Sequence, residues 1–239
     1  MTVYERQNKI MNFLKQQHFT TIKELSKIVW ASESSVRRDV KALENKNCLK
    51  QIYGGVVYPG FENSVVPIAL RDHYNSSVKE ELAKQASKYF YDGATVFMDG
   101  SSTVRRIIKY INNFHRIKII TNNQHVFNEV ISPEISLYCT GGRFLSEDKI
   151  FVGNIAENFV KGIHADLMFF SSQGISVTGE ITDASDEETA LRQAMLSRAK
   201  KKIFLCDSSK IGLQYTFTVC NKDRIDHIIC DKNLPWEEN

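Results

Sequence analysis

The segment 32–41 combines short hydroxyl side chains with basic side chains. Three serines, Ser32, Ser34 and Ser35, are followed by Arg37, Arg38 and Lys41. Short side chains let a helix approach base edges closely, and Arg or Lys reaches guanine or a phosphate oxygen. The pattern therefore predicts contact with double-stranded DNA through the exposed N-terminal half of a helix.

Polar or glycine-containing loops follow several predicted apolar strands. They read D-G-S-S-T at 99–103, T-N at 121–122, G-G-R at 141–143 and D-S-S-K at 207–210. Unpaired backbone N–H groups, hydroxyls and the dipole of a following helix suit a phosphate group, to which Arg143 and Lys210 would add positive charge. Because parallel strands end at one edge of a sheet, we expect these loops to converge on an anionic ligand. The alternative is that each loop is a capped, solvated turn and that Arg143 lies on the surface.

No residue pattern indicates a catalytic or metal centre. The six histidines are scattered without an HxxxH pair, and the five cysteines form no CxxC. Neither a Ser-His-Asp pattern nor a glycine-rich nucleotide fingerprint is visible. We therefore expect no catalytic residue, no metal and no cofactor, and we expect the cysteines to be buried, reduced thiols.

Three predicted helices position the basic segment. Apolar spacing predicts a helix over 3–17, and a capping-box sequence at Thr21 begins a second helix. Ser32 can cap a third helix, in which an apolar stripe from Val36 to Leu43 faces inward and the basic side chains face outward. Asp39 is expected to pair with a neighbouring basic group or helix end, because a lone carboxylate would repel DNA phosphates.

Two apolar runs at 49–53 and 56–58 flank Gly54 and Gly55. This pattern predicts a small hairpin. After three helices, such a hairpin would be the wing of a winged helix-turn-helix.

From residue 76 onward, predicted strands alternate with predicted helices. The strands are expected near 94–98, 117–121, 135–140, 167–171, 202–206, 215–219 and 227–230, and the helices near 77–90, 104–113, 124–131, 154–162 and 187–200. This order predicts a larger Rossmann-like α/β domain with a mostly parallel sheet covered on both faces. The stretch 59–75 has little periodicity and contains Pro and Gly, so it is expected to be a linker. The predicted domains are 1–58 and 76–239.

Charge is unevenly distributed over the 239 residues. Residues 1–58 contain ten Lys and Arg against five Asp and Glu, whereas the remainder is close to neutral. A basic head fits a nucleic-acid contact, although charge alone fits a solvated basic surface equally well. We find no apolar run of membrane-spanning length and no signal peptide, so we expect a cytoplasmic protein with no membrane partner.

The head resembles the DeoR-type helix-turn-helix. The matching features are Arg6, which corresponds to an Arg that the family has before its first helix, S-V-R-R-D-V at 35–40 and Y-G-G at 53–55. Ser35 stands where the family usually has Thr. Trp30 stands where the turn usually has Gly, which implies either a different turn or an aromatic side chain near the first helix. The alternative for the segment is a winged helix used for protein contact.

Residues 76–231 are similar to the sensor domain of DeoR regulators. The matches include M-D at 98–99, T-G-G at 140–142, F-V-G at 151–153 and D-S-S-K at 207–210. The resemblance implies a fold related to ribose-5-phosphate isomerase and the CoA transferases, with a phosphorylated sugar or related metabolite as effector. Three departures put the effector's identity in question: Ser101 replaces a Gly, Gln173 replaces an Asp, and Arg192 replaces a Lys.

Taken together, these features predict a DNA-binding transcription regulator, a repressor of a sugar-catabolic operon that works as a homodimer or homotetramer. The predicted DNA-binding residues are Thr21, Ser32, Ser34, Ser35, Arg37, Arg38, Lys41, Lys50, Gln51 and Tyr53. The predicted effector-binding residues are Asp99, Gly100, Ser101, Ser102, Thr103, Thr121, Asn122, Gly141, Gly142, Arg143, Gln173, Asp183 and Lys210. Two alternatives stay open: a second domain that only oligomerises, or a sugar-phosphate isomerase-like enzyme that uses Asp99, Asp166 or Asp183.

Overall fold

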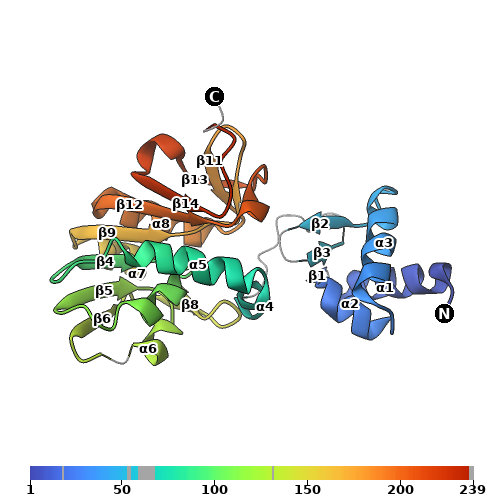
Figure 1. Ribbon diagram of the computed structural model, residues 1–239, viewed down its shortest axis with the longest axis horizontal. Helices are drawn as coiled ribbons and strands as arrows, with labels where there is room; N and C mark the ends of the chain where they lie inside the picture. Colours follow the sequence, from blue (N-terminus) through green and yellow to red (C-terminus); the bar gives the residue numbers. More distant parts are fainter. Residues whose placement is uncertain (18, 53–54, 59–67, 131, 237–239) are drawn as a thin grey trace. The chain divides into compact units, whose positions relative to one another are not determined.

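The computed structural model describes the chain except for residues 18, 53–54, 59–67, 131 and 237–239 (Figure 1). The chain divides into two compact units, Met1–Val66 and Pro67–Asn239. Each unit has its own hydrophobic core.

The described part of the first unit contains three helices and a small antiparallel sheet. The helices are α1 (Val3–Gln17), α2 (Ile22–Ile28) and α3 (Glu33–Glu44), and the strands are β1 (Phe19–Thr20), β2 (Lys50–Ile52) and β3 (Gly55–Val57). The sheet order is β1-β3-β2. The helices agree with the sequence prediction, whereas the two-residue strand β1 was not predicted because it is too short to show a pattern.

Both predicted helix caps of the first unit are confirmed. Thr21 caps α2, and its side chain and that of Glu24 make the two reciprocal bonds of a capping box. Ser32 caps α3 and accepts a hydrogen bond from the Ser35 N–H. These local bonds fix where α2 and α3 begin, and thereby which side of α3 faces the core.

The predicted wing hairpin is confirmed in its strands. The register pairs Ile52 with Gly55, and the predicted turn residues 53–54 lie outside the described residues. Gly55 belongs to β3, where a Cβ atom would lie 2.3 Å from the carbonyl oxygen of Thr20. This glycine therefore allows β1 to lie close against the wing.

The second unit is built on a six-stranded parallel sheet of order β14-β12-β9-β4-β5-β6. Its strands are β4 (Thr95–Met98), β5 (Ile117–Thr121), β6 (Ile135–Cys139), β9 (Ala165–Phe170), β12 (Ala199–Cys206) and β14 (His227–Cys230). All five neighbouring pairs are parallel, as the alternation of strands and helices predicts.

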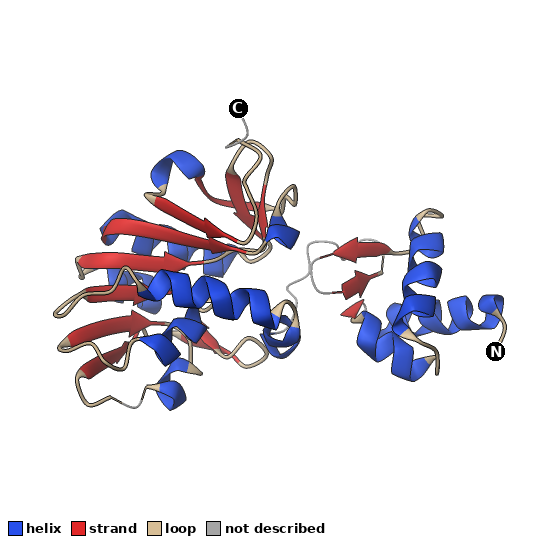
Figure 2. Ribbon diagram, viewed as in Figure 1, coloured by secondary structure: helices blue, strands red, loops and turns tan. Residues whose placement is uncertain are grey.

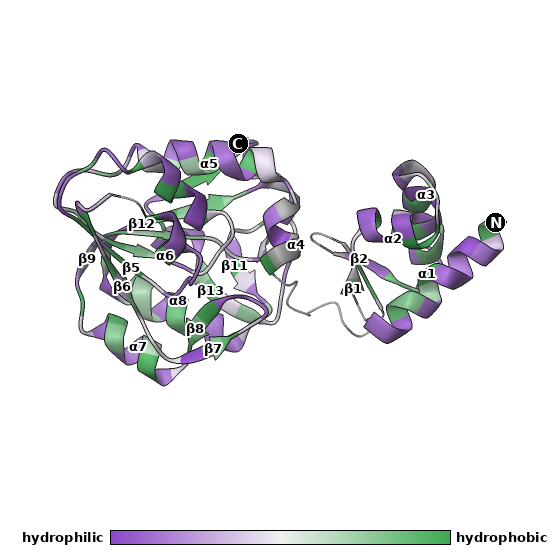
Figure 3. Cartoon of the chain, turned by 90° about the horizontal axis from the view of Figure 1, so that it is seen from below, coloured by the Kyte–Doolittle hydropathy of each residue, from purple (hydrophilic) through white to green (hydrophobic). Residues whose placement is uncertain are grey.

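Helices cover both faces of this sheet (Figure 2). One face packs against α5 (Ser76–Ser87), the 3-10 helix η1 (Val104–Tyr110) and α6 (Val126–Glu129). The other packs against α7 (Asn154–Lys161) and α8 (Asp186–Arg198). Side chains alternate along β4, where Val96 and Met98 contact the first layer and Phe97 the second. In Figure 3 the strands of this sheet are coloured mainly hydrophobic, whereas α1 and α5 show both colours.

Two hairpins complete the second unit and were missed in the sequence. The first is β7 (Arg143–Leu145) with β8 (Ile150–Val152). The second is β10 (Gly174–Ile175) with β11 (Glu180–Asp183), which also pairs with β13 (Phe217–Asn221). Two- to four-residue strands carry too few residues to display an alternating pattern.

Three predictions about the second unit need correction. Residues 68–73 were assigned to the linker but form helix α4 (Ile68–His73), which is too short to show periodicity. The helix expected near 77–90 is α5, which begins at Ser76 after Asn75, whose φ is 50°, and already ends at Ser87. The helix expected over 104–113 is the 3-10 helix η1.

Candidate nucleic-acid interface and ligand site

The outer face of α3 presents the predicted basic side chains. The side chains of Arg37 and Lys41 are 63% and 66% exposed, and Arg38 is also exposed. Val36 and Val40 on the opposite face are fully buried in the core of the first unit. The apolar stripe therefore holds α3 with its basic side outward, as predicted.

Asp39 is a structural residue, as expected. It is 3% exposed, and the guanidinium of Arg6 donates to both of its carboxylate oxygens, with a distance of 3.1 Å between Nη2 and Oδ1. The pair ties α1 to α3. The hydrogen bond to Asp39 raises the pKa of Arg6.

Glu44 connects the end of α3 to the wing. It accepts bonds from the backbone N–H of Gln51 at 2.9 Å and from its side-chain amide at 2.8 Å. Lys41 also donates to Glu44 at 3.1 Å. Burial raises the pKa of this carboxyl, but the bonds from Gln51 and Lys41 outweigh it and the net shift is downward. Gln51 and Lys41 thus have protein partners, Lys50 is exposed, and Tyr53 lies outside the described residues.

Trp30 occupies the turn between α2 and α3. Its φ of 50° is the left-handed conformation that Gly adopts without strain, and its side chain is 90% exposed. The turn is therefore retained, and the indole does not pack on the first helix.

In the second unit, the strand ends bring the predicted polar residues to one edge of the sheet. Asp99 follows β4, Asn122 follows β5, Gln173 follows β9 and Lys210 follows β12. All four are at least 94% buried. This convergence of loops was predicted, whereas the contacts among the residues were not.

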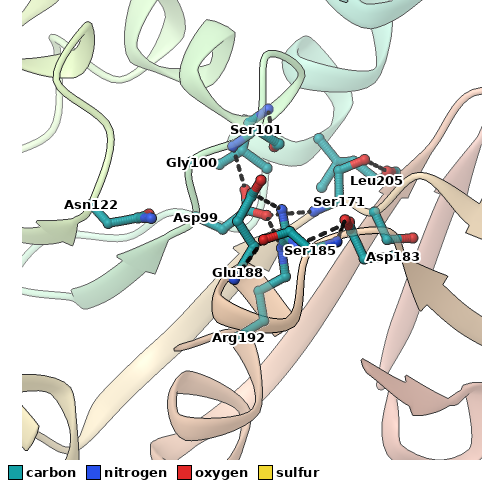
Figure 4. A network of polar contacts seen from close by, with 12 residues as sticks. Asp99, Gly100, Ser101, Asn122, Ser171, Asp183, Ser185, Glu188, Arg192 and Leu205 are labelled. Carbon is teal, nitrogen blue, oxygen red and sulfur yellow. Dashed lines mark hydrogen bonds and ion pairs between the residues drawn. The ribbon is translucent and has the colours of Figure 1, made fainter. Parts of the chain in front are cut away.

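Arg192 on α8 is the centre of a buried ion-pair network (Figure 4). Its guanidinium donates to Asp99 at 2.8 Å, Asp183 at 3.0 Å and Glu188 at 2.6 Å. All four side chains are 2–3% exposed. Two predicted effector residues, Asp99 and Asp183, are therefore held by Arg192, which also leaves neither of them free to act as a general base.

Burial and charge act in opposite directions in this network. Burial lowers the pKa of Arg192, but Glu188, Asp183 and Asp99 outweigh it and the net shift is upward. Burial raises the pKa of Glu188, and the attraction of Arg192 does not fully compensate. The network thus depends on the guanidinium to keep its carboxylates in a buried place.

The loop at 99–103 uses part of its own hydrogen-bonding capacity. Asp99 accepts from the Ser101 N–H at 3.1 Å, and the Ser101 hydroxyl accepts from the Val104 N–H at 3.2 Å. The backbone N–H groups of Ser101 and Val104 therefore already have acceptors, and fewer N–H groups than expected are available to a phosphate. The seven-residue 3-10 helix η1 also offers a weaker dipole than the expected α-helix.

A group of buried cations surrounds this loop and was missed in the sequence. Lys79 on α5 is fully buried and donates to the Ser102 hydroxyl at 3.2 Å. Lys210 donates to the Ser171 hydroxyl at 2.7 Å. Arg71 on α4 is 7% exposed and donates to Asp148 at 2.6 Å. Nothing in the local pattern distinguishes Lys79 from a solvated helix residue, so only the tertiary structure reveals it.

Two predicted effector residues carry buried polar atoms without a partner among the described residues. These atoms are the Asn122 Oδ1 and the Gln173 Nε2, and the Arg71 Nε shares this property. One acceptor and two donors are therefore unsatisfied around the strand ends. Such atoms are rare in folded proteins and are explained by a ligand or by bound water.

The remaining predicted effector residues take other positions. Thr103 is buried, and the Thr121 hydroxyl accepts from the Asn123 N–H at 3.1 Å. Gly141 and Gly142 have φ values of 65° and 109°, and Arg143 forms an exposed ion pair with Glu187. The backbone of Gly100 and the side chains of Asn122 and Arg192 line a space too narrow for a water molecule. A ligand at this edge would therefore have to displace side chains.

A separate open cleft of about 510 Å³ lies beside α4 and η1. Of the cations that line it, Arg105 binds Asp72 at 2.7 Å and Glu129 at 2.7 Å. Because these partners neutralise Arg105, the cleft is a weaker candidate for an anion than the strand ends.

Two further observations bear on the sequence predictions. The five cysteines are free; Cys206 and Cys220 are buried, whereas the expected burial is wrong for the other three, which are partly exposed. Within the described ranges, none of the helices has the length and apolar character needed to cross a bilayer.

Comparison with known proteins matches both units to family models. Residues 6–60 match the DeoR-like helix-turn-helix domain, and residues 74–232 match the DeoR C terminal sensor domain.

The curated relatives are similar over almost the whole chain. The HTH-type transcriptional regulator GolR of Listeria innocua is 32% identical, with 98% of this chain and 92% of the relative covered. The lactose phosphotransferase system repressor of Staphylococcus epidermidis is 29% identical, with 98% and 94% covered. The putative aga operon transcriptional repressor of Escherichia coli O157:H7 is 26% identical, with 97% and 87% covered.

Two solved structures are similar to parts or most of this chain. A chain of the tetrameric eIF2B-beta2-delta2 complex from Chaetomium thermophilum has a TM-score of 0.50 at 13% identity, with 95% of this chain and 89% of that chain covered. A D-ribose-5-phosphate isomerase in complex with phospho-erythronic acid has a TM-score of 0.41 at 15% identity, with 57% and 54% covered.

Proposed function

Because this chain belongs to the DeoR family of transcriptional regulators, we propose that it represses a sugar-catabolic operon until a phosphorylated sugar binds its second unit. The relatives are named as regulators and repressors, among them repressors of the aga operon and of a lactose phosphotransferase system. The chain is accordingly a DNA-binding regulator and not an enzyme. The operon and the effector are the proposed part.

The outer face of α3 is the observation that carries the DNA-binding role. It exposes Arg37 and Arg38 beside three serines, of which Ser32 bonds through its hydroxyl to the hydroxyls of Ser34 and Ser35, each at 3.0 Å. Side chains of this kind reach base edges and phosphates when a helix enters the major groove. One head offers few contacts, so the proposal includes a homodimer or homotetramer that binds repeated half-sites.

The unsatisfied atoms of Asn122 and Gln173 support the effector role. A sugar phosphate has hydroxyls that donate to the Asn122 oxygen and oxygens that accept from the Gln173 amide. Loop 99–103 and Lys210 lie at the same edge and suit the phosphate.

Gel-shift titration with DNA from upstream of the protein's own operon tests the first half of the proposal. Arg37→Ala or Arg38→Ala is expected to weaken specific binding by about 1–3 kcal/mol if the residue reads a base. The matched control is Lys84→Ala, which removes an exposed cation from α5 in the other unit. Unchanged DNA affinity in both α3 variants would show that α3 does not contact the DNA.

Repeating the titration with pentose and hexose monophosphates tests the second half. Release of the DNA by one of them supports the sensor role. A second candidate function, in which the second unit only oligomerises, is favoured by the closed space beside Arg192. Intact operator binding that no metabolite shifts, together with an oligomer in light scattering, would select that candidate.

A further inference from the structure

Lys79 links helix α4 to the loop at 99–103. Its ammonium donates to the backbone carbonyl of Arg71 in α4 and to the Ser102 hydroxyl at 3.2 Å. The side chain is fully buried. The position of α4 thus depends directly on a cation that also contacts the proposed ligand loop.

The environment of Lys79 disfavours its charged form. Burial, the charge of Lys210 and the charges of Arg71 and Arg106 lower its pKa to about 7, and Asp207 opposes them. Several buried cations near one another are costly unless an anion joins them. The cluster is therefore suited to a ligand of high negative charge.

Arg71 supplies a second donor from α4. Its Nη2 binds Asp148 at 2.6 Å, but its Nε has no hydrogen-bond partner among the residues described. The charges of Glu188 and Asp183 act to raise the pKa of Arg71, so Arg71 lies near the Arg192 network. A buried, unsatisfied guanidinium nitrogen beside this network is an available donor for an anion.

We propose that a dianionic phosphate monoester bound at loop 99–103 draws Lys79 away from the Arg71 carbonyl and engages the Arg71 guanidinium, so that α4 shifts when the ligand binds. The space beside Arg192, which Asp99 and Asn122 also line, is closed, so a ligand that enters it has to displace side chains. Helix α4 is the first described element of the second unit, so its shift would occur at the N-terminal end of that unit. The inference rests on the proposed function in one respect, that a phosphorylated ligand binds this edge.

Calorimetric proton uptake on the full chain tests the role of Lys79. Ribose 5-phosphate and glucose 6-phosphate are the probes, with ribose and glucose as uncharged controls. Near pH 8 these esters are dianions, since their second pKa is about 6. A neighbouring dianion raises the pKa of Lys79, so the protein should take up as much as about one proton when the ester binds. The uptake is obtained from the binding enthalpies in two buffers of different ionisation enthalpy.

Lys79→Met is the decisive variant, with Lys84→Met, on the exposed side of the same helix, as the control. Lys79→Met is expected to fold, because it removes a charge that burial disfavours. It should bind the phosphate probe about tenfold or more weakly and lose the proton uptake, whereas Lys84→Met should resemble the wild type. Wild-type affinity and proton uptake in Lys79→Met would overturn the inference while leaving the effector role intact. Failure of the wild type to bind any phosphorylated probe would overturn both.

Hydrogen exchange of Ile68–His73 tests the movement of α4. The amides of this helix are expected to change their exchange rate when the probe binds the wild type, and to change less in Lys79→Met. Unchanged exchange in α4 at saturating probe would show that the phosphate binds without moving this helix, and the proposed coupling would be wrong.

Discussion

Replacement of Arg192 by Met should strongly destabilise the second unit. The substitution leaves Asp99, Asp183 and Glu188 facing one another at 2–3% exposure. Removal of one partner from a buried ion pair costs about 3–5 kcal/mol, because the other charge stays buried. For a unit of this size each kcal/mol lowers the Tm by about 2–4 °C, so we expect a decrease of about 10 °C.

The cost should depend on pH in a defined direction. Without Arg192, burial and mutual repulsion raise the carboxyl pKa values of the folded state above those of the unfolded chain. A carboxyl whose pKa is higher in the folded state than in the unfolded state stabilises the folded state when pH lies below its unfolded pKa. This stabilisation is lost as pH rises through the folded-state pKa. The loss in the free energy of unfolding that Arg192→Met causes should therefore be largest near neutral pH and become smaller toward about pH 5. Glu188, whose pKa burial already raises in the wild type, should protonate first.

Differential scanning calorimetry of the full chain is the assay. Arg198→Met is the matched control, because Arg198 lies on the same helix and donates to the Ile163 carbonyl rather than to a carboxylate. It should lower the Tm of the second unit by only a few degrees. A deficit for Arg192→Met below about 1 kcal/mol, independent of pH, would refute the network as the source of stability.

Three smaller predictions concern single residues. Asp39→Asn removes the ionic partner of Arg6 and should cost the first unit about 1–3 kcal/mol in urea unfolding; an unchanged midpoint would mean that the pair contributes nothing. Trp30→Gly should stabilise the same unit by about 0.5–1 kcal/mol, because its φ of 50° strains any residue with a Cβ, and a loss of stability would instead indicate that the indole has a folded-state contact. Gly142→Ala should destabilise the second unit by about 2 kcal/mol or more, since φ is 109° and the new Cβ would lie 2.5 Å from the Val152 carbonyl oxygen; wild-type thermal stability would show that β8 yields easily.

The first unit could be predicted almost completely because its signals are local. Thr21 and Ser32 are followed by residues that complete their caps, and the apolar stripe of α3 repeats at helical spacing. Even the pairing of Asp39 followed from charge, because a carboxylate on a DNA-facing helix needs a partner. Only its identity, Arg6, required the structure.

The convergence of the candidate ligand loops was predictable, whereas their contacts were not. Parallel topology alone brings the strand ends together, so the loops at 99–103 and 207–210 were expected at one edge of the sheet. Arg192 and Asp99 are 93 positions apart, and Lys79 and Ser102 are 23 apart. No rule of periodicity or spacing connects residues so far apart in the sequence. A buried Lys on an amphipathic helix has the same sequence pattern as an exposed one, and only the loop that covers it distinguishes the two.

The placement of the two tryptophans gives the protein one optical reporter in each unit. Trp30 is 90% exposed beside α3, whereas Trp236 packs on the core of the second unit with the Lys222 ammonium 4.8 Å from its ring centre. The emission of Trp30 should be that of an indole in water and that of Trp236 the emission of a shielded indole. A Trp236→Phe chain would then report events at the head alone, and a Trp30→Phe chain would report the sensor alone. DNA docking and the proposed metabolite binding can thus be followed separately in the same molecule without an added dye.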